Sequence, residues 1–184
     1  MFSQGFSMPD PRIAPLMPSA FGMGMALAQA RMKATGNRHL IGLAAIPVHL
    51  TTIDAQALSV VQGSWPPSSH RWQSVLSYLP YETLWFDSAL WSGTTLCGIA
   101  VGHQARHVRP DTLDITEIQG SPLGHPLKGA TRFYIAETGA ALATLIPTIR
   151  RVRLKNPVNA KVTALYSALQ FDPAVDPPHC VRNV

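Results

Sequence analysis

Residues 159–171 read NAKVTALYSALQF and follow a short predicted strand at residues 151–154. The apolar side chains of this stretch recur at intervals of three and four residues, which is the period of one helix face. They are Val162, Leu165, Tyr166 and Leu169. The spacing alone therefore predicts an amphipathic helix in which Tyr166 is a core aromatic side chain.

A second informative stretch lies upstream, where residues 126–131 read PLKGAT and open a predicted helix at residues 131–146. The first turn of a helix presents unpaired N–H groups and a partial positive charge, and both attract phosphate. Gly129 would let a phosphate approach the backbone, Lys128 adds charge, and Thr131 adds a hydroxyl donor. The Gly-Lys-Ser/Thr order of a Walker loop is absent. An ordinary capped turn is the alternative.

The rest of the chain is predicted to contain both strands and helices. The predicted strands occupy residues 39–50, 83–90, 95–101, 113–118 and 151–154. The predicted helices occupy residues 19–33, 52–61, 68–78, 131–146 and 159–169. Ser92 and Gly93 indicate a hairpin turn, and small residues such as Gly139 suit helix 131–146 to close packing on a sheet. The proline-rich residues 172–184 are predicted to be irregular or a poor edge strand.

Residues 1–37 are rich in Met, Pro, Gly and Ser and are interpreted as an N-terminal extension to one domain at residues 38–184. A short helix at residues 19–33 would face the core through Phe21, Met25, Ala28 and Met32. A loosely held extension and a homodimer contact are both open for this segment.

The 159–171 stretch resembles the late motif of the GNAT N-acetyltransferase superfamily. That motif has an Asn, a Leu-Tyr pair and then Gly-Phe. Asn159, Tyr166 and Phe171 match it, whereas Gln170 stands at the glycine. The resemblance covers residues 83–171, with a looser fit from residue 39. It implies an α/β fold with a mixed central sheet flanked by helices in a single domain.

The 126–131 stretch is similar to the GNAT pyrophosphate loop, which reads Arg/Gln-x-x-Gly-x-Gly/Ala. Gly129 matches the central glycine. Pro126 replaces the leading Arg/Gln, and Thr131 replaces the final small residue. A proline at this position removes only one N–H donor.

The resemblance implies an enzyme, an acetyl-CoA-dependent N-acetyltransferase that needs no metal. The cofactor pyrophosphate would bind the backbone amides of Lys128, Gly129, Ala130 and Thr131. Asn159 would hold the pantetheine arm, and a backbone amide near Ile118 would polarise the thioester carbonyl. The acceptor would be an amine of a small molecule, a protein or an aminoacyl-tRNA.

The resemblance also implies that Tyr166 protonates the departing thiolate as a general acid. Glu117 and Asp114 are candidates for the base that takes a proton from the incoming ammonium. Their odd spacing puts them on opposite faces of a regular strand, and we favour Glu117 because it is nearer the cofactor end. A solvent-facing carboxylate, with water as the base, is the alternative.

Composition narrows the class of protein. Hydrophobic residues make up 46% of the 184 residues and charged residues 14%, which predicts a compact domain. No apolar run is long enough to span a bilayer, so we expect a cytoplasmic protein with no membrane partner. The two cysteines provide neither a disulfide framework nor a zinc-ligand pair.

The formal net charge of +5 favours anionic partners. Four cations gather in and around the predicted strand at residues 151–154: Arg150, Arg151, Arg153 and Lys155. They keep a nucleic-acid-binding protein open as an alternative, although the interleaved aromatic residues of single-strand binders are absent. A GNAT-like binding module without catalysis is the other alternative.

Overall fold

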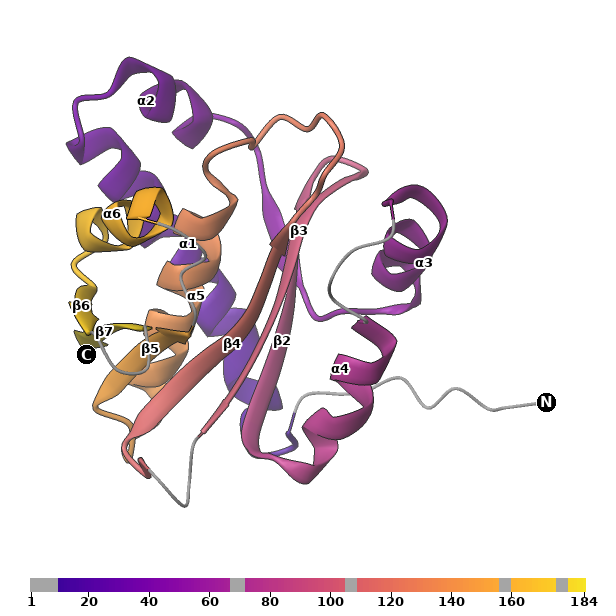
Figure 1. Ribbon diagram of the computed structural model, residues 1–184, viewed down its shortest axis with the longest axis vertical. Coiled ribbons are helices and arrows are strands. Elements are labelled where there is room, and N and C mark those ends of the chain that lie inside the picture. The colour runs from indigo at the N-terminus through magenta and orange to yellow at the C-terminus, as the bar shows by residue number, and fades with distance from the viewer. Residues whose placement is uncertain (1–9, 67–71, 105–108, 156–159, 175–178) are drawn as a thin grey trace.

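The computed structural model describes residues 10–66, 72–104, 109–155, 160–174 and 179–184. Within these residues the strands form one seven-stranded sheet in the order β1-β2-β3-β4-β5-β7-β6 (Figure 1). The strands are β1 (His49–Thr51), β2 (Thr83–Ser92), β3 (Thr95–Gln104), β4 (Thr112–Gly120), β5 (Arg151–Lys155), β6 (Asp172–Ala174) and β7 (His179–Asn183). Neighbouring strands are antiparallel except β4 and β5, which are parallel, so the sheet is mixed.

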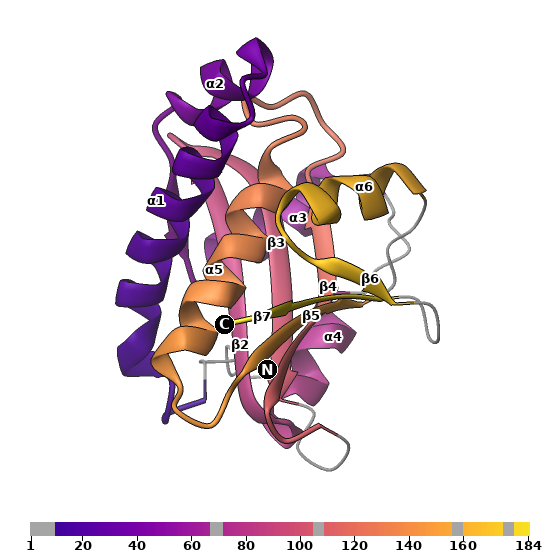
Figure 2. The same ribbon diagram turned by 90° about the vertical axis from the view of Figure 1, so that its left-hand side faces the viewer.

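Helices cover both faces of the sheet. They are α1 (Met17–Ala34), α2 (Arg38–Ala44), α3 (Ala55–Ser64), α4 (Trp72–Tyr78), α5 (Thr131–Leu145) and α6 (Ala160–Ala168), with short 3-10 turns at Ala14–Leu16 and Leu79–Tyr81. One core lies between the sheet and the layer that contains α1, α5 and α6, and the other lies under α3 and α4 (Figures 1 and 2). The order of elements predicted for residues 83–169 is confirmed.

The helix predicted at residues 19–33 is α1, and it packs directly on α5. Phe21, Ala28 and Met32 of the predicted face are buried, and Met25 is partly buried. The two helices approach most closely at Gly24, where an added Cβ would lie 2.5 Å from the Cα of Thr138. Only a glycine permits this approach.

The small-residue face predicted for α5 also serves close packing. A Cβ added at Gly139 would lie 2.4 Å from Cδ1 of Ile115 on β4. Because α5 lies so close to the sheet here, it is held firmly against β4, the strand that precedes it in the chain. The predicted hairpin turn is confirmed as well, with Gly93 at a φ of 57° between β2 and β3.

The strand predicted at residues 39–50 is wrong for most of its length. Residues 38–44 form α2, because the Asn37 side chain accepts hydrogen bonds from the N–H groups of His39 (2.9 Å) and Leu40 (3.3 Å) and caps a helix there. The run has no strict alternation, so its periodicity does not distinguish a helix from a buried strand. Only His49–Thr51 pairs with β2, at the edge of the sheet.

The prediction of a poor edge strand in residues 172–184 is confirmed for β6 and wrong for β7, which is an interior strand. It pairs antiparallel with β5 on one side and with β6 on the other. The edge position belongs to β6, where Pro173 lacks an N–H that an edge strand can spare. Residues 179–183 contain no proline and so can pair on both sides. The start of the helix predicted at residues 68–78 lies outside the described residues.

Candidate functional site

Strands β4 and β5 begin side by side and then part. β4 is paired with β3 from Leu113 to Gly120, but with β5 only from Thr112 to Ile115 (Figure 1). Residues 116–120 of β4, which we call the diverging segment, therefore extend beyond the last pair with β5. Among the described residues, no strand pairs with the edge of this segment that faces away from β3, and an extended ligand could add there as another strand would.

A β-bulge at Thr116 begins the diverging segment. Glu117 is paired with Val101, and the next pair is Ile115 with Gly102, so Thr116 has no register partner of its own on β3. A bulge bends its strand and redirects the side chains that follow it. The bend therefore starts where β4 leaves β5.

The bulge also overturns the prediction that Asp114 and Glu117 lie on opposite faces. Asp114 is opposite His103 and Glu117 is opposite Val101 on β3. His103 and Val101 are two residues apart and share a face. Both carboxylates consequently lie on the face covered by α3 and α4, where Val101 belongs to the core.

The two carboxylates differ in their surroundings. Asp114 is fully buried, accepts a hydrogen bond from Nε of Arg153 at 2.7 Å, and lies 3.2 Å from Nζ of Lys155. Glu117 is half-buried and lies near Tyr78 of α4. Burial raises the pKa of the Tyr78 phenol, and the charge of Glu117 raises it further. Asp114 is thus buried and paired with two cations, whereas Glu117 is partly exposed to solvent.

Tryptophans pack beneath α3 and α4. Trp65, Trp72, Trp85 and Trp91 are all buried in this core, which decides between a pocket lining and a core role in favour of the core. Trp72 also donates from Nε1 to Oε1 of Gln119 at 2.5 Å, and so attaches α4 to the diverging segment of β4.

A cavity of about 210 Å³ lies where β4 ends and α5 begins. It is lined by Gly120, Ser121, His125, Lys128, Gly129, Thr131 and Arg132. Lys128 and Arg132 give the cavity a positive charge, and the N-terminus of α5 adds a partial positive charge. The predicted phosphate loop is therefore part of a real cavity.

The amides of this loop are of two kinds. The N–H groups of Lys128 and Ala130 donate within the turn, to the carbonyls of His125 (3.3 Å) and Leu127 (2.8 Å). Those of Gly129, Thr131 and Arg132 have no hydrogen-bond partner among the described residues. Gly129 has a φ of 94°, a conformation that favours glycine. Three amides are thus available to an anion.

Two side chains of the cavity have distinct roles. The Thr131 hydroxyl donates to the carbonyl oxygen of Cys97 at 3.3 Å or of Leu127 at 3.5 Å, so its hydrogen is used within the protein. Nδ1 of His125 is buried and has no hydrogen-bond partner in the part of the chain that the structure describes. Burial lowers the pKa of His125, and the nearby Lys128 lowers it further.

Tyr166 lies in the core, with 4% of its surface exposed, and the cationic side chain of Arg132 lies near its hydroxyl. Burial raises the pKa of this phenol, while Arg132 acts in the opposite direction. Because Arg132 also lines the cavity, it connects Tyr166 to the α5 N-terminus. Arg132 was not predicted from the sequence, although its place in the first turn of the predicted helix was a signal.

The end of α6 explains the spacing of Tyr166 and Phe171. The N–H of Phe171 donates to the carbonyl of Tyr166 (3.0 Å), and that of Gln170 donates to Ser167 (2.9 Å). This is a Schellman motif, whose hydrophobic contact joins the same two rings, with centroids 6.4 Å apart. Gln170 occupies the left-handed position at a φ of 63°, where a glycine is usual. Asn159 lies outside the described residues.

Comparison with solved structures identifies the architecture. An acetyltransferase from Thermus thermophilus matches with a TM-score of 0.51 and 14% identity, over 74% of this chain and 97% of that chain. The aminoglycoside acetyltransferase AAC(6')-Ib in complex with coenzyme A matches with a TM-score of 0.53 and 14% identity, over 74% and 95%. YncA from Salmonella typhimurium, with acetyl-CoA, matches at 0.51 and 13%, over 74% and 93%. This chain has the GNAT fold.

No protein-family model and no curated sequence matches the chain, so among the comparisons only those with solved structures support the GNAT fold. Among the described residues, no helix is long and apolar enough to cross a membrane. The same residues contain no group of three His, Cys, Asp or Glu side chains placed to hold a metal ion.

The cation cluster of this GNAT-fold chain is largely neutralised within the protein. Arg151 donates to both carboxylate oxygens of Asp111 at 2.8 Å. Arg153 is buried against Asp114, and Lys155 contacts the same carboxylate. Paired cations have little charge left for a phosphate backbone, so the geometry weighs against a polynucleotide surface here.

Proposed function

We propose that this GNAT-fold chain is an acyl-CoA-dependent N-acyltransferase that transfers an acetyl group to an amine. The observation that carries the proposal is the diverging segment of β4, residues 116–120, which ends at the positively charged cavity before α5. A CoA thioester has a matching shape, with an extended amide-containing arm attached to a pyrophosphate.

In this proposal the cofactor pyrophosphate binds the α5 N-terminus. The free amides of Gly129 and Thr131, together with the charges of Lys128 and Arg132, are suited to an anion. Ala130 shapes the turn between them. The pantetheine arm lies along β4, and Asn159, which precedes α6 in the sequence, holds it.

The proposed reaction is a direct transfer. The amine nitrogen attacks the thioester carbonyl carbon, whose oxygen is polarised by the backbone amide near Ile118. The carbon–sulfur bond then breaks, and the thiolate takes a proton from Tyr166. Glu117 accepts the proton that the ammonium must lose. The attacking nitrogen loses its second proton as the amide forms, and this proton restores the Tyr166 phenol, while Glu117 releases the first proton to solvent. The products are an amide, free CoA and one proton, so atoms and charges balance.

The surroundings of the three titratable groups support these roles. The raised pKa of Tyr166 keeps its phenol protonated at neutral pH, so a proton is present to donate. Glu117 is favoured over Asp114 as the base because Asp114 is fully buried and paired with two cations. Arg153 and Lys155 occupy the Asp114 carboxylate oxygens, so an incoming ammonium cannot reach them.

One observation favours a second candidate, a CoA-binding module without catalysis. The Schellman motif accounts for the position of Tyr166 by packing alone. A retained cofactor cavity and a purely structural Tyr166 would produce binding but no turnover.

The proposal is tested first by cofactor binding. Acetyl-CoA should raise the melting temperature of the protein and appear as a bound mass in native mass spectrometry. Lys128→Glu reverses a charge in the cavity and should remove the thermal shift. Lys33→Glu reverses an exposed charge on α1 and serves as the control. If millimolar acetyl-CoA neither binds nor stabilises the wild type, the proposed function is wrong.

A further inference from the structure

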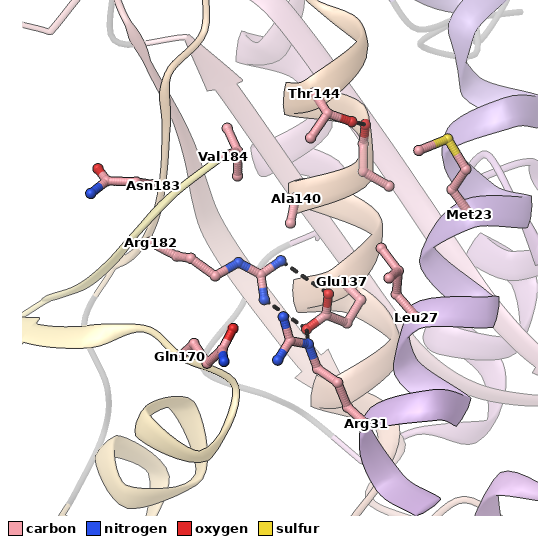
Figure 3. A pocket seen from close by; sticks show the side chains of 11 residues that line it. Met23, Leu27, Arg31, Glu137, Ala140, Thr144, Gln170, Arg182, Asn183 and Val184 are labelled. Atoms are coloured by element: carbon pink, nitrogen blue, oxygen red, sulfur yellow. Dashed lines mark hydrogen bonds and ion pairs between the residues drawn. The ribbon is translucent and has the colours of Figure 1, made fainter. Parts of the chain in front are cut away.

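A second cavity, of about 240 Å³, lies between α1, α5 and β7 (Figure 3). It shares no lining residue with the cavity at the α5 N-terminus. Its charged groups are Arg31 from α1, Glu137 from α5 and Arg182 from β7. Three segments distant in sequence thus contribute to one charged cluster.

The side chains of the cluster carry two positive charges and one negative charge. Glu137 is fully buried and receives two hydrogen bonds from Arg182, at 2.7 and 3.0 Å. Nε of Arg31 lies 2.7 Å from the same Oε1 atom that Arg182 already occupies. One carboxylate therefore faces two guanidinium groups.

Arg31, rather than Arg182, carries the positive charge that has no matching negative charge among the side chains. Arg182 also donates to the carbonyl of Leu169 at 2.9 Å and stacks 4.7 Å from the ring centroid of Phe171. The Nε of Arg31 is buried, and its contact with Glu137 lacks the alignment of a hydrogen bond. Within the described residues the outer nitrogens of Arg31 donate no hydrogen bond, and 28% of this side chain is exposed. A partly buried cation in this state favours an added anion.

The walls of the cavity indicate what kind of anion fits. Met23 and Leu27 of α1, Ala140 of α5 and Val184 beyond β7 give it apolar sides (Figure 3). Leu27 is four residues before Arg31, so the two side chains lie on one face of the helix. A single surplus charge matches a carboxylate better than a doubly charged phosphate.

We propose that this cavity binds a small organic carboxylate with a short aliphatic chain. The carboxylate accepts hydrogen bonds from the outer nitrogens of Arg31, whose planar fork suits it. The aliphatic chain lies against Met23 and Leu27. This site is separate from the proposed cofactor site and does not depend on the acyltransferase activity.

The test is a thermal-shift titration of the full chain with sodium butyrate into the tens of millimolar range. Butyramide has the same chain without the charge, and sodium chloride at equal ionic strength controls for salt. Butyrate should give a saturable rise, reaching about 3 °C or more at tenfold its dissociation constant. Butyramide, chloride and inorganic phosphate should give less. An equal response to butyramide or chloride would overturn the proposal, as would no response to butyrate.

Two pairs of variants locate the binding site. Arg31→Met leaves Glu137 with its partner Arg182 and should abolish the butyrate shift, whereas Lys33→Met on the exposed side of α1 should keep it. Leu27→Glu places a carboxylate one turn from Arg31 and should also abolish the shift, whereas Leu27→Gln should keep it. The second pair decides the matter if Arg31→Met does not fold. A butyrate shift that survives Leu27→Glu would refute the site.

Discussion

Replacing Asp87 by asparagine is expected to stabilise the protein above neutral pH. Asp87 is fully buried on β2, beneath α3. Its Oδ1 accepts a hydrogen bond from the N–H of Ile53 at 2.5 Å, while Oδ2 has no partner among the described residues. Burial raises its pKa to about 7 from 3.8, the Ile53 bond opposes this rise, and the charge of Asp54 adds to it.

The size of the effect follows from linkage between protonation and folding. The folded state holds a proton on Asp87 between about pH 4 and pH 7, whereas the unfolded chain has lost it. Stability therefore falls as pH rises through this window. The full penalty, about 4 kcal/mol, is present above pH 7 and absent below pH 4. Asparagine keeps the acceptor for Ile53 and cannot ionise, but it buries one additional N–H at a cost of ~1 kcal/mol. The net gain at pH 8 is about 3 kcal/mol.

Urea unfolding followed by tryptophan fluorescence measures this gain, because all four tryptophans are buried. The free energy of unfolding of the wild type should decrease from pH 5 to pH 8, and that of Asp87→Asn should change much less. Asp172→Asn, at an exposed position on the edge strand β6, is the control and should keep the wild-type slope. If Asp87→Asn shows the wild-type pH slope, the assignment of a protonated Asp87 is wrong.

Three further changes test the cofactor region. Tyr166→Phe should leave CoA binding intact and slow thiol release from acetyl-CoA by roughly 10²-fold if Tyr166 is the general acid; equal rates would restrict this residue to packing. Gln170→Gly should raise the free energy of unfolding by about 0.5–1 kcal/mol, because glycine adopts the left-handed conformation at a φ of 63° without strain. A lower free energy of unfolding in urea denaturation would contradict this. CoA affinity, measured by calorimetry, should increase from pH 7 to pH 5 as His125 gains a proton beside the phosphate; the same increase in His125→Gln would exclude that residue.

Strands and helices were predicted correctly from the sequence where the local pattern of residues was distinctive. Residues 83–101 were predicted well because two apolar runs flank a glycine that takes a positive φ at Gly93. Residues 39–50 were not, because an unbroken apolar run fits a helix as well as a strand and the cap at Asn37 was overlooked. The interior position of β7 depends on pairing with β5, which no local pattern in residues 179–183 reveals.

The candidate site shows the same division. The loop at Gly129 was found from its own residues and lines a cavity. The relation of Asp114 to Glu117 was wrong because the bulge at Thr116 is a property of two strands in register, and a one-residue shift reverses every face that follows. The second cavity lay outside local reasoning altogether, since Arg31 and Arg182 meet only in the folded chain.

The interior place of β7 has a consequence for the order of events during synthesis. Among the described strands β6 pairs with β7 alone, and β7 leaves the ribosome after it. Until residues 179–183 emerge, β5 presents a bare edge that can pair with another nascent chain. Glu137 likewise lacks its bidentate partner, Arg182, until β7 has been synthesised. A nascent chain stalled before β7 would therefore be an incompletely folded, aggregation-prone intermediate with an exposed strand edge. Chaperones that bind such edges would be needed most at that stage.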